Sequence, residues 1–205
     1  MDGAHLEATR ERAILMGMSD PAPRPMTVDE FLVWNDGTDT RYELDGGQPV
    51  AMAPPAATHG ALAMAIGIQI GTRLRPPCRV VSEAGIRLSD HEDTYFQADI
   101  AVTCQPLKPG MVPVPDPTII VEILSPSTAQ FDRGRKLAIY REIPSVQEIL
   151  LLDSTKRYAE LWHREDEQSW VVRDIRGCDV IGGGTLRFPS VGIEIPMASL
   201  YEGVL

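Results

Sequence analysis

The chain has 205 residues and a mass of 22.5 kDa, which suits one domain or one domain with a tail. Its hydrophobic fraction of 43% and charged fraction of 23% are ordinary for a globular protein, which excludes a collagenous, coiled-coil or wholly disordered chain. The formal net charge of −10 argues against a general polycationic binder of nucleic acid or anionic membranes, although it leaves room for a local basic groove.

The cysteine content and the first residues are typical of a cytoplasmic protein. The three cysteines, Cys78, Cys104 and Cys178, are odd in number and form no C-x-x-C pair. We therefore expect neither a disulfide framework nor a cysteine-based zinc site. The first residues lack an apolar signal region, and no apolar run reaches the roughly 18 residues that a membrane span needs. These features predict a cytoplasmic location without membrane association.

The amino-terminal residues are predicted to form a tail, residues 1–25, ahead of one domain over residues 26–205. Residues 4–16 have the pattern of a short helix, and a proline-rich linker follows them. The domain begins with the capping box Thr27-Val-Asp-Glu30, in which each end of the motif satisfies a backbone amide of the other. This motif predicts a helix over residues 28–35.

The rest of the chain alternates predicted strands with two longer helices. The helices are expected over residues 58–74, capped by Thr58, and over residues 129–142, capped by Ser127 or Thr128. The strands are expected over residues 41–47, 48–53, 79–88, 95–103, 118–124, 147–152, 157–163, 170–175 and 186–188. This order predicts an α/β or α+β fold: a mixed sheet with helices on its faces and a carboxy-terminal set of antiparallel strands.

Three carboxylates stand where strands are expected. Glu122 interrupts an apolar run that has the pattern of a central strand, and Asp99 lies inside another strand. Glu43 lies in the first hairpin. A buried carboxylate must be paired, protonated or bound to a metal ion, and two carboxylates on neighbouring strands suit Mg²⁺. The alternative interpretation for each is a buried salt bridge to Arg or Lys.

The helix over residues 129–142 carries cations directly after the strand of Glu122. The spacing of Arg133, Lys136 and Tyr140 places them on one helix face. The plain alternative is an ordinary surface pair between Asp132 and Lys136. His59, near the start of the other long helix, is a candidate for phosphate contact, against the alternative of a helix-end or packing role.

These residues together resemble a known family. Asp99, then Glu122 on an apolar strand, then Ser125-Pro-Ser-Thr128 and the basic helix of Lys136, are similar to the large bacterial family of restriction-endonuclease-like proteins in the PD-(D/E)XK nuclease superfamily. The match runs from about residue 26 to about residue 155, and includes Tyr42-Glu-Leu-Asp-Gly-Gly47. The resemblance implies a restriction-endonuclease-like fold and a DNA substrate, and it makes a homodimer an expectation.

The resemblance also implies roles for single residues. Asp99 and Glu122 would be ligands of Mg²⁺ or Mn²⁺, and Glu43 would be the additional catalytic carboxylate. The family's proline before the aspartate is Ala98 here, and the lysine expected two residues after Glu122 is Leu124. Some superfamily members have this lysine on the following helix, which makes Lys136 its candidate. Residues expected to bind substrate are Arg133, Tyr140 and His59.

Two functional hypotheses from different classes follow. The first is a metal-dependent endonuclease that hydrolyses phosphodiester bonds of DNA, with a cation lowering the pKa of water and a lysine stabilising phosphate charge. The second is a catalytically inactive nuclease-like module that serves in binding or assembly. The acidic net charge and Leu124 favour the second, and the convergence of motifs favours the first.

Overall fold

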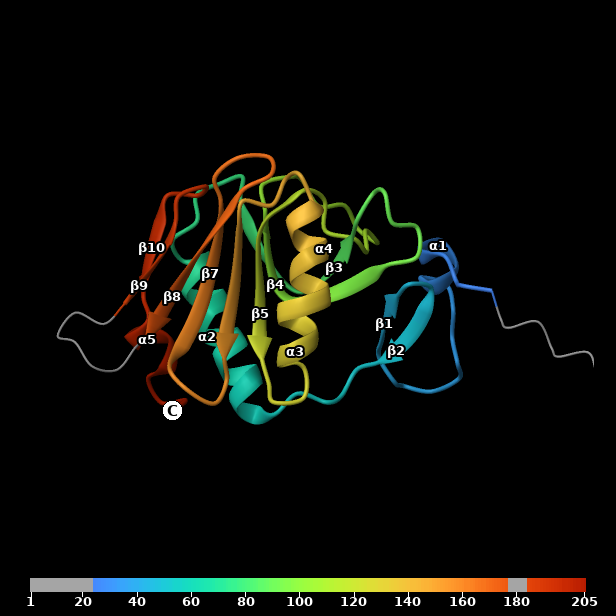
Figure 1. Cartoon of the computed structure of the whole chain (residues 1–205), viewed down its shortest axis with the longest axis horizontal. Coiled ribbons are helices and arrows are strands. Elements are labelled where there is room, and N and C mark those ends of the chain that lie inside the picture. The colour runs from blue at the N-terminus through green and yellow to red at the C-terminus, as the bar shows by residue number, and fades with distance from the viewer. Residues whose placement is uncertain (1–23, 177–183) are drawn as a thin grey trace, which may run out of the picture.

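The computed structural model describes residues 24–176 and 184–205 (Figure 1). The helix predicted over residues 4–16 and Cys178 lie outside the described residues. The helices are α1 (Val28–Phe31), α2 (Ala57–Gly71), α3 (Ala129–Phe131), the π-helix η1 (Asp132–Lys136), α4 (Leu137–Glu142) and α5 (Ala198–Tyr201). The strands are β1 (Tyr42–Asp45), β2 (Gln48–Ala51), β3 (Arg79–Arg87), β4 (Tyr95–Thr103), β5 (Pro117–Leu124), β6 (Glu148–Asp153), β7 (Tyr158–Arg164), β8 (Trp170–Arg176), β9 (Thr185–Phe188) and β10 (Ile193–Pro196).

Eight strands form one mixed sheet. Its order is β2-β1-β4-β5-β6-β7-β8, and β3 pairs with β4 beside this path. Strands β5 and β6 are parallel, because α3, η1 and α4 carry the chain back along the sheet between them, and the other pairs are antiparallel. Strands β9 and β10 form a separate hairpin. The predicted mixed sheet with carboxy-terminal antiparallel strands is therefore confirmed.

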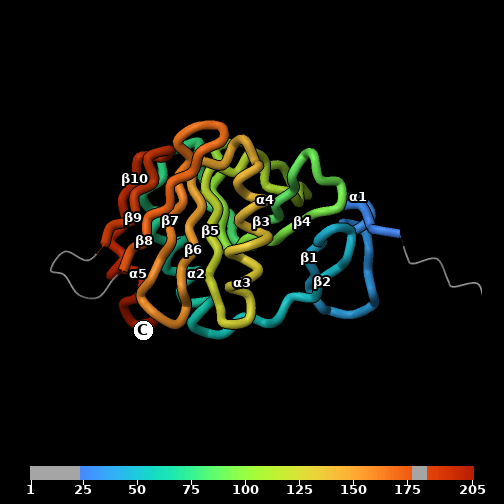
Figure 2. Tube along the Cα trace, in the orientation of Figure 1, coloured from blue at the N-terminus to red at the C-terminus, as the bar shows by residue number. Residues whose placement is uncertain are grey.

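Two cores cover the two faces of the sheet (Figures 1 and 2). On one face, α2, α5 and the β9–β10 hairpin pack on side chains that include Val121 and Ile123 of β5. On the other face, α3 and α4 pack against a core that includes Ile120 and Leu124. Both parities of β5 are therefore buried, as expected for a central strand of this composition. Glu122 shares the parity of Ile120 and Leu124, so it faces the η1–α4 side.

One edge of β4 pairs with two different strands, β1 and β5, and a gap separates these two pairings. Strand β3 occupies the whole of the opposite edge, from the pair Arg87–Tyr95 to the pair Arg79–Thr103. The first edge pairs with β1 only at Tyr95 and with β5 only from Ile100 onward. Residues 96–99 lie between these two contacts, so their backbone groups on this edge have no ladder partner and are open to side chains.

The backbone is also irregular at this division. Glu83 of β3, which lies between the paired residues Ser82 and Ala84, has a φ of 50°. This left-handed conformation is unusual for a residue other than glycine and clusters at functional sites. Opposite Glu83, the side chains of β4 change the face of the sheet to which they point. Phe96 and Ala98 face the η1–α4 side, whereas Ile100 and Val102, of the same parity, face α2. The shift occurs at Asp99.

The structure confirms the predicted strands and helices in position but corrects their ends. The capping box is present, since Thr27 Oγ1 accepts from Glu30 N and the Glu30 side chain accepts from Thr27 N. The predicted Thr58 cap is wrong, because α2 begins one residue earlier after Ala56. Thr128 is the N-cap residue of α3, as one of the two predicted candidates, but its side chain makes no cap hydrogen bond. Strand β10 and helix α5 were not predicted.

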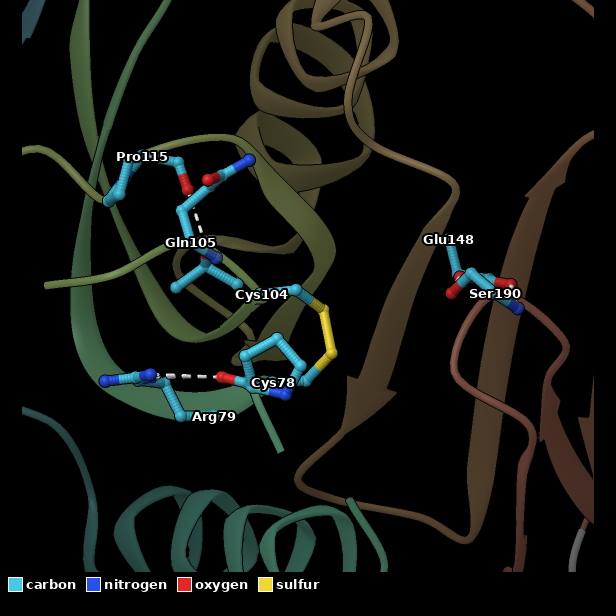
Figure 3. The surroundings of a disulfide bond; sticks show 9 residues. Cys78, Arg79, Cys104, Gln105, Pro115, Glu148 and Ser190 are labelled. Carbon is cyan, nitrogen blue, oxygen red and sulfur yellow. Dashed lines mark hydrogen bonds between the residues drawn. A yellow bond between two sulfur atoms is a disulfide. The ribbon is translucent and has the colours of Figure 1, made fainter. Parts of the chain in front are cut away.

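The cysteine expectation also needs a correction. Cys78 and Cys104 form a disulfide (Figure 3). They adjoin the paired residues Arg79 and Thr103, so the antiparallel register of β3 and β4 brings them opposite each other. A count of cysteines carries no register and therefore could not reveal this pair.

Candidate active site

The ammonium group of Lys136 lies at the centre of a buried charged cluster. Its Nζ is 2.8 Å from Glu43 Oε1, 3.2 Å from Glu122 Oε1 and 3.8 Å from Asp132 Oδ1. The side chains of all four residues are at most 8% exposed. The four come from three elements, β1, β5 and η1, which are far apart in sequence.

The π-helix explains why Asp132 and Lys136 both face inward. Residues Asp132–Lys136 are wound as a π-helix between two α-helical segments. A π turn is wider than an α turn and appears mostly as a single insertion, often at a functional site. It follows β5 after a short connection and α3, and it places Lys136 against Glu122.

Glu122 is buried against Tyr140. The Tyr140 hydroxyl donates to Glu122 Oε1 over 2.6 Å, and both side chains lie in the core. Burial raises the pKa of Glu122 to about 8; the Lys136 charge opposes this, while Asp99 and Asp132 add to it. Burial alone would lower the pKa of Lys136, but Glu122 and Glu43 outweigh burial and hold that pKa above its usual value. Lys136 is therefore an ammonium at neutral pH.

Asp99 lies beside this cluster and binds different partners. Its Oδ2 accepts from the backbone amide of Ile123 over 2.7 Å and is 3.3 Å from His59 Nε2. Asp99 and Glu122 adjoin the paired residues Ile100 and Val121, so they flank the point where β4 and β5 separate. The hydrogen bond that His59 donates to Asp99 raises the pKa of His59 above its usual value. His59, the predicted site residue of α2, therefore connects to the cluster through Asp99.

Glu43 of β1 binds the segment of β4 that has no ladder partner on this edge. Its Oε1 accepts from the backbone amide of Gln97 over 2.8 Å, in addition to contacting Lys136. Gln97 belongs to the segment of β4 that lacks a ladder partner on this edge. The open backbone amides of Gln97 and Ile123 are thus taken by the carboxylates of Glu43 and Asp99, which fixes both side chains.

The arginines of the basic helix turn away from the cluster. Arg133 Nε contacts Glu160 Oε1 of β7 over 2.6 Å, and Arg135 Nε contacts Asp45 Oδ1 over 2.8 Å. The guanidinium of Arg141 lies over the rings of Trp162 and Trp170. The expected shared face therefore holds for Lys136 and Tyr140 but not for Arg133, which pairs with Glu160 of β7 instead.

Sequence reasoning underestimated Asp132. The alternative of an ordinary surface pair with Lys136 is wrong, because Asp132 is 4% exposed and burial raises its pKa. The signal that could have found it is the D-x-x-x-K spacing directly after the strand of Glu122. A helix whose inward face carries both residues must bury both.

The cluster contains more carboxyl groups than basic groups. Four carboxylates, those of Glu43, Asp99, Glu122 and Asp132, share the neighbourhood of one lysine and one histidine. Such a site attracts cations and disfavours anions unless a further positive charge is supplied. Within residues 24–176 and 184–205, no group of three or more His, Cys, Asp or Glu side chains is already arranged to hold a metal ion.

Comparison with known proteins assigns the family. The model of the Uma2 family, described as "Putative restriction endonuclease", matches residues 28–188. This match covers well over half of the chain, so the protein belongs to the Uma2 family. The resemblance found from the sequence motifs is thereby confirmed, and the family supports a nuclease-like function.

Two cyanobacterial relatives and one solved structure are similar to the chain. Uncharacterized protein slr1290 of Synechocystis is 25% identical over 193 residues, which cover 93% of this chain and 99% of the relative. Uncharacterized protein sll1609 of the same organism is 27% identical, over 74% of this chain and 88% of its own. The crystal structure of a putative nuclease belonging to DUF820 from Anabaena variabilis is 21% identical with a TM-score of 0.68, and covers 88% of this chain and 100% of its own. That structure confirms the predicted fold.

The described helices give one further finding. In the part of the chain that the structure describes, no helix is long and apolar enough to cross a membrane.

Proposed function

We propose that the protein is a Mg²⁺- or Mn²⁺-dependent endonuclease that hydrolyses phosphodiester bonds of DNA. The observation that carries this proposal is the buried Lys136 ammonium, held among Glu43, Glu122 and Asp132 at the point where the sheet divides. A nuclease-like family and a buried cation beside strand carboxylates together favour phosphoryl-transfer chemistry over a purely structural salt bridge.

The donor set suits a hard divalent cation. Carboxylate oxygens are the ligands that Mg²⁺ takes in proteins, commonly one or two together with water and substrate phosphate. Asp99 and Glu122 would hold the cation, and its charge would favour the ionised form of Glu122 against the burial that raises the pKa of this carboxyl group. When bound, the cation supplies an activated water and neutralises charge on the phosphate.

The chain's own residues would prepare this site. The Lys136 ammonium offers a fixed positive charge to a phosphate without occupying a coordination position. Glu43 and Asp132 position Lys136, and the Tyr140 hydroxyl fixes the orientation of the Glu122 carboxylate. His59 holds Asp99 and is the candidate for contact with substrate.

A second function is favoured by one specific observation. Lys136 already contacts three carboxylates, and Arg133 and Arg135 are paired with Glu160 and Asp45. A site whose three nearby cations are each paired with carboxylates in this way suits a catalytically inactive nuclease-like module for binding or assembly. The homodimer stays a prediction from the resemblance, and sedimentation velocity is the measurement that tests it.

Plasmid nicking distinguishes the two functions. Supercoiled plasmid is incubated with purified protein and Mg²⁺ or Mn²⁺, with EDTA as the metal-free control. Lys136→Met removes the cation of the cluster, and Lys156→Met removes an exposed lysine as the matched control. We expect nicking by wild type and Lys156→Met, and a loss of about 10²-fold or more in Lys136→Met, the scale of a lost electrostatic stabiliser.

Binding of Mn²⁺, followed by electron paramagnetic resonance, separates the remaining outcomes. Nicking that persists unchanged in Lys136→Met contradicts the proposed role of this lysine. Wild-type protein that binds Mn²⁺ and DNA without nicking supports the inactive module instead. Circular dichroism of each variant shows whether a lost activity reflects a lost fold.

A further inference from the structure

A second candidate site lies in the amino-terminal region, around α1, β1 and the loop between them (Figure 1). A cavity of about 250 Å³ there is lined by three aromatic rings and several polar side chains. We call it the aromatic pocket; its rings are Phe31, Trp34 and Tyr42, and its polar side chains include Asp36, Thr38 and Thr40.

The rings of the aromatic pocket form walls that meet at an angle. The Trp34 and Tyr42 centroids are 5.0 Å apart with an interplanar angle of 77°, and Phe31 lies 6.3 Å from Trp34 at 23°. Trp34 remains 37% exposed, although an indole of this size is normally covered. Its ring is therefore available to a ligand.

Asp36 supplies a negative charge to this pocket. The Tyr42 hydroxyl donates to its Oδ2 over 2.6 Å, and the Thr38 amide and hydroxyl donate to its Oδ1 over 2.9 Å each. These bonds, led by that from Tyr42, lower the pKa of Asp36, so the carboxylate is ionised at neutral pH. All three donors are neutral and hold the carboxylate in place without cancelling its charge.

The two acids of α1 differ from Asp36 in this respect. Asp29 pairs with Arg87 and Glu30 pairs with Arg24. Among the described residues, no Lys, Arg or His forms an ion pair with Asp36. The charge of Asp36 therefore remains to be balanced by solvent or by a ligand.

Aromatic walls with an uncompensated carboxylate are complementary to an organic cation. Trp and Tyr faces attract alkylammonium and guanidinium groups through the ring quadrupole, and a fixed anion adds to that attraction. A nucleotide would also stack on Trp34, but its phosphate would meet the charge of Asp36 with no paired cation to offset it. The charge therefore favours a cation over nucleic acid.

The aromatic pocket is separate from the candidate active site. Tyr42 and Glu43 are consecutive in β1, so their side chains point to opposite faces of the strand. Glu43 points to Lys136, and Tyr42 therefore faces away from that cluster. We propose that the aromatic pocket binds a compact organic cation, an alkylammonium or a guanidinium group. This proposal does not depend on nuclease activity.

The indole N–H resonances of the protein test the proposal directly. The chain has three tryptophans, and Trp34→Phe identifies the Trp34 signal in a ¹H–¹⁵N correlation spectrum. Choline is the alkylammonium probe, agmatine is the guanidinium probe, and 3,3-dimethylbutan-1-ol is the neutral isostere of choline. We expect a saturable shift of Trp34 with at least one cation, at a dissociation constant of millimolar order, and none with the alcohol.

Two variants that each remove one negative charge show whether binding depends on the aromatic pocket or only on the nearby net charge. Asp36→Asn keeps the size of the side chain and should weaken binding about two- to fivefold, and Asp39→Asn, outside the lining, should weaken it less. A saturable shift with only one cation identifies its class and supports the proposal. The absence of a shift with either cation, an equal shift with the alcohol, or equal effects of the two variants would overturn it. The spectrum itself reports whether each variant folds.

Discussion

Glu122 and Glu148 are both buried glutamates on the parallel neighbours β5 and β6, yet they lie in very different surroundings. Glu122 faces η1 and α4 among Lys136, Tyr140 and further carboxylates. Glu148 faces the other side of the sheet, where the amide and hydroxyl of Ser190 donate to it and His163 Nδ1 lies 3.3 Å away. The first gathers charges from three elements, whereas the second ties the β9–β10 turn to the sheet.

The difference shows that burial of a carboxylate does not by itself indicate a functional site. Both pKa values are raised, first of all by burial. What distinguishes Glu122 is an excess of like charge around one ammonium, in a place where the backbone ladder is interrupted. Glu148 has neutral donors and one histidine, as expected of a satisfied structural carboxylate.

The largest expected effect comes from breaking the charged cluster. Lys136→Met leaves several buried carboxylates without their ammonium partner and should lower the free energy of unfolding by about 3–5 kcal/mol. Adding Glu122→Gln should restore part of that loss, because one of the unpaired charges is removed. Urea denaturation of the two single variants and the double variant measures this coupling. Strictly additive losses would contradict the cluster.

Reduction of the disulfide tests whether the region around Glu148 affects stability without affecting catalysis (Figure 3). Its closed loop spans a sequence separation of 26 residues, so reduction should lower the free energy of unfolding by about 3 kcal/mol. The candidate active site does not include either cysteine. We expect dithiothreitol to lower the unfolding midpoint of wild type but not that of Cys78→Ser, and to leave plasmid nicking unchanged in both. Loss of nicking on reduction would show that the two regions are coupled.

A smaller effect is expected from Ser190→Ala. It removes the hydroxyl donor to Glu148 while the backbone amide of residue 190 remains, so the cost should be about 1 kcal/mol. Ser199→Ala, which loses only an exposed hydrogen bond to Pro196 O, is the control and should cost less. Thermal unfolding compares the two. Equal stability of both variants would mean that the Ser190 hydroxyl does not hold Glu148.

The smallest effect is a pH dependence of stability. The pKa of Glu148 is raised in the folded state above its ordinary value of 4.5, so folding favours its protonated form. Its contribution to stability is complete below about pH 4.5 and is lost as the pH rises through the raised value. Glu148→Gln should therefore gain stability relative to wild type between pH 5 and pH 8. A constant difference in urea midpoint across this range would contradict the raised pKa.

Much of the fold could be predicted from local patterns. The apolar run of β5 and the capping box before α1 carry strong signals, because central strands and helix starts have distinctive compositions. Strand β10 and helix α5 are only four residues each, and α5 lacks the side-chain cap that marks the equally short α1. The pair Cys78–Cys104 depends on strand register, which no local pattern contains.

The candidate site could be predicted only where the neighbouring residues in the sequence mark a functional side chain. Glu122 stands out because its neighbours on both sides are apolar, whereas Glu148 opens its strand and follows Gln147, so nothing marks it as buried. Asp132 was not among the predicted site residues, because its spacing from Lys136 fits an exposed pair equally well. Arg133 could not be placed, since its partner Glu160 comes from a strand 27 residues further along the chain.

The most direct test of the central claim uses the two glutamates as each other's control. Glu122→Gln and Glu148→Gln make the same chemical change at two buried positions of adjacent strands, and plasmid nicking in Mn²⁺ is measured for both beside wild type. The account predicts metal-dependent nicking by wild type and Glu148→Gln and none by Glu122→Gln. Equal nicking by the two folded variants would contradict the assignment of the site to Glu122.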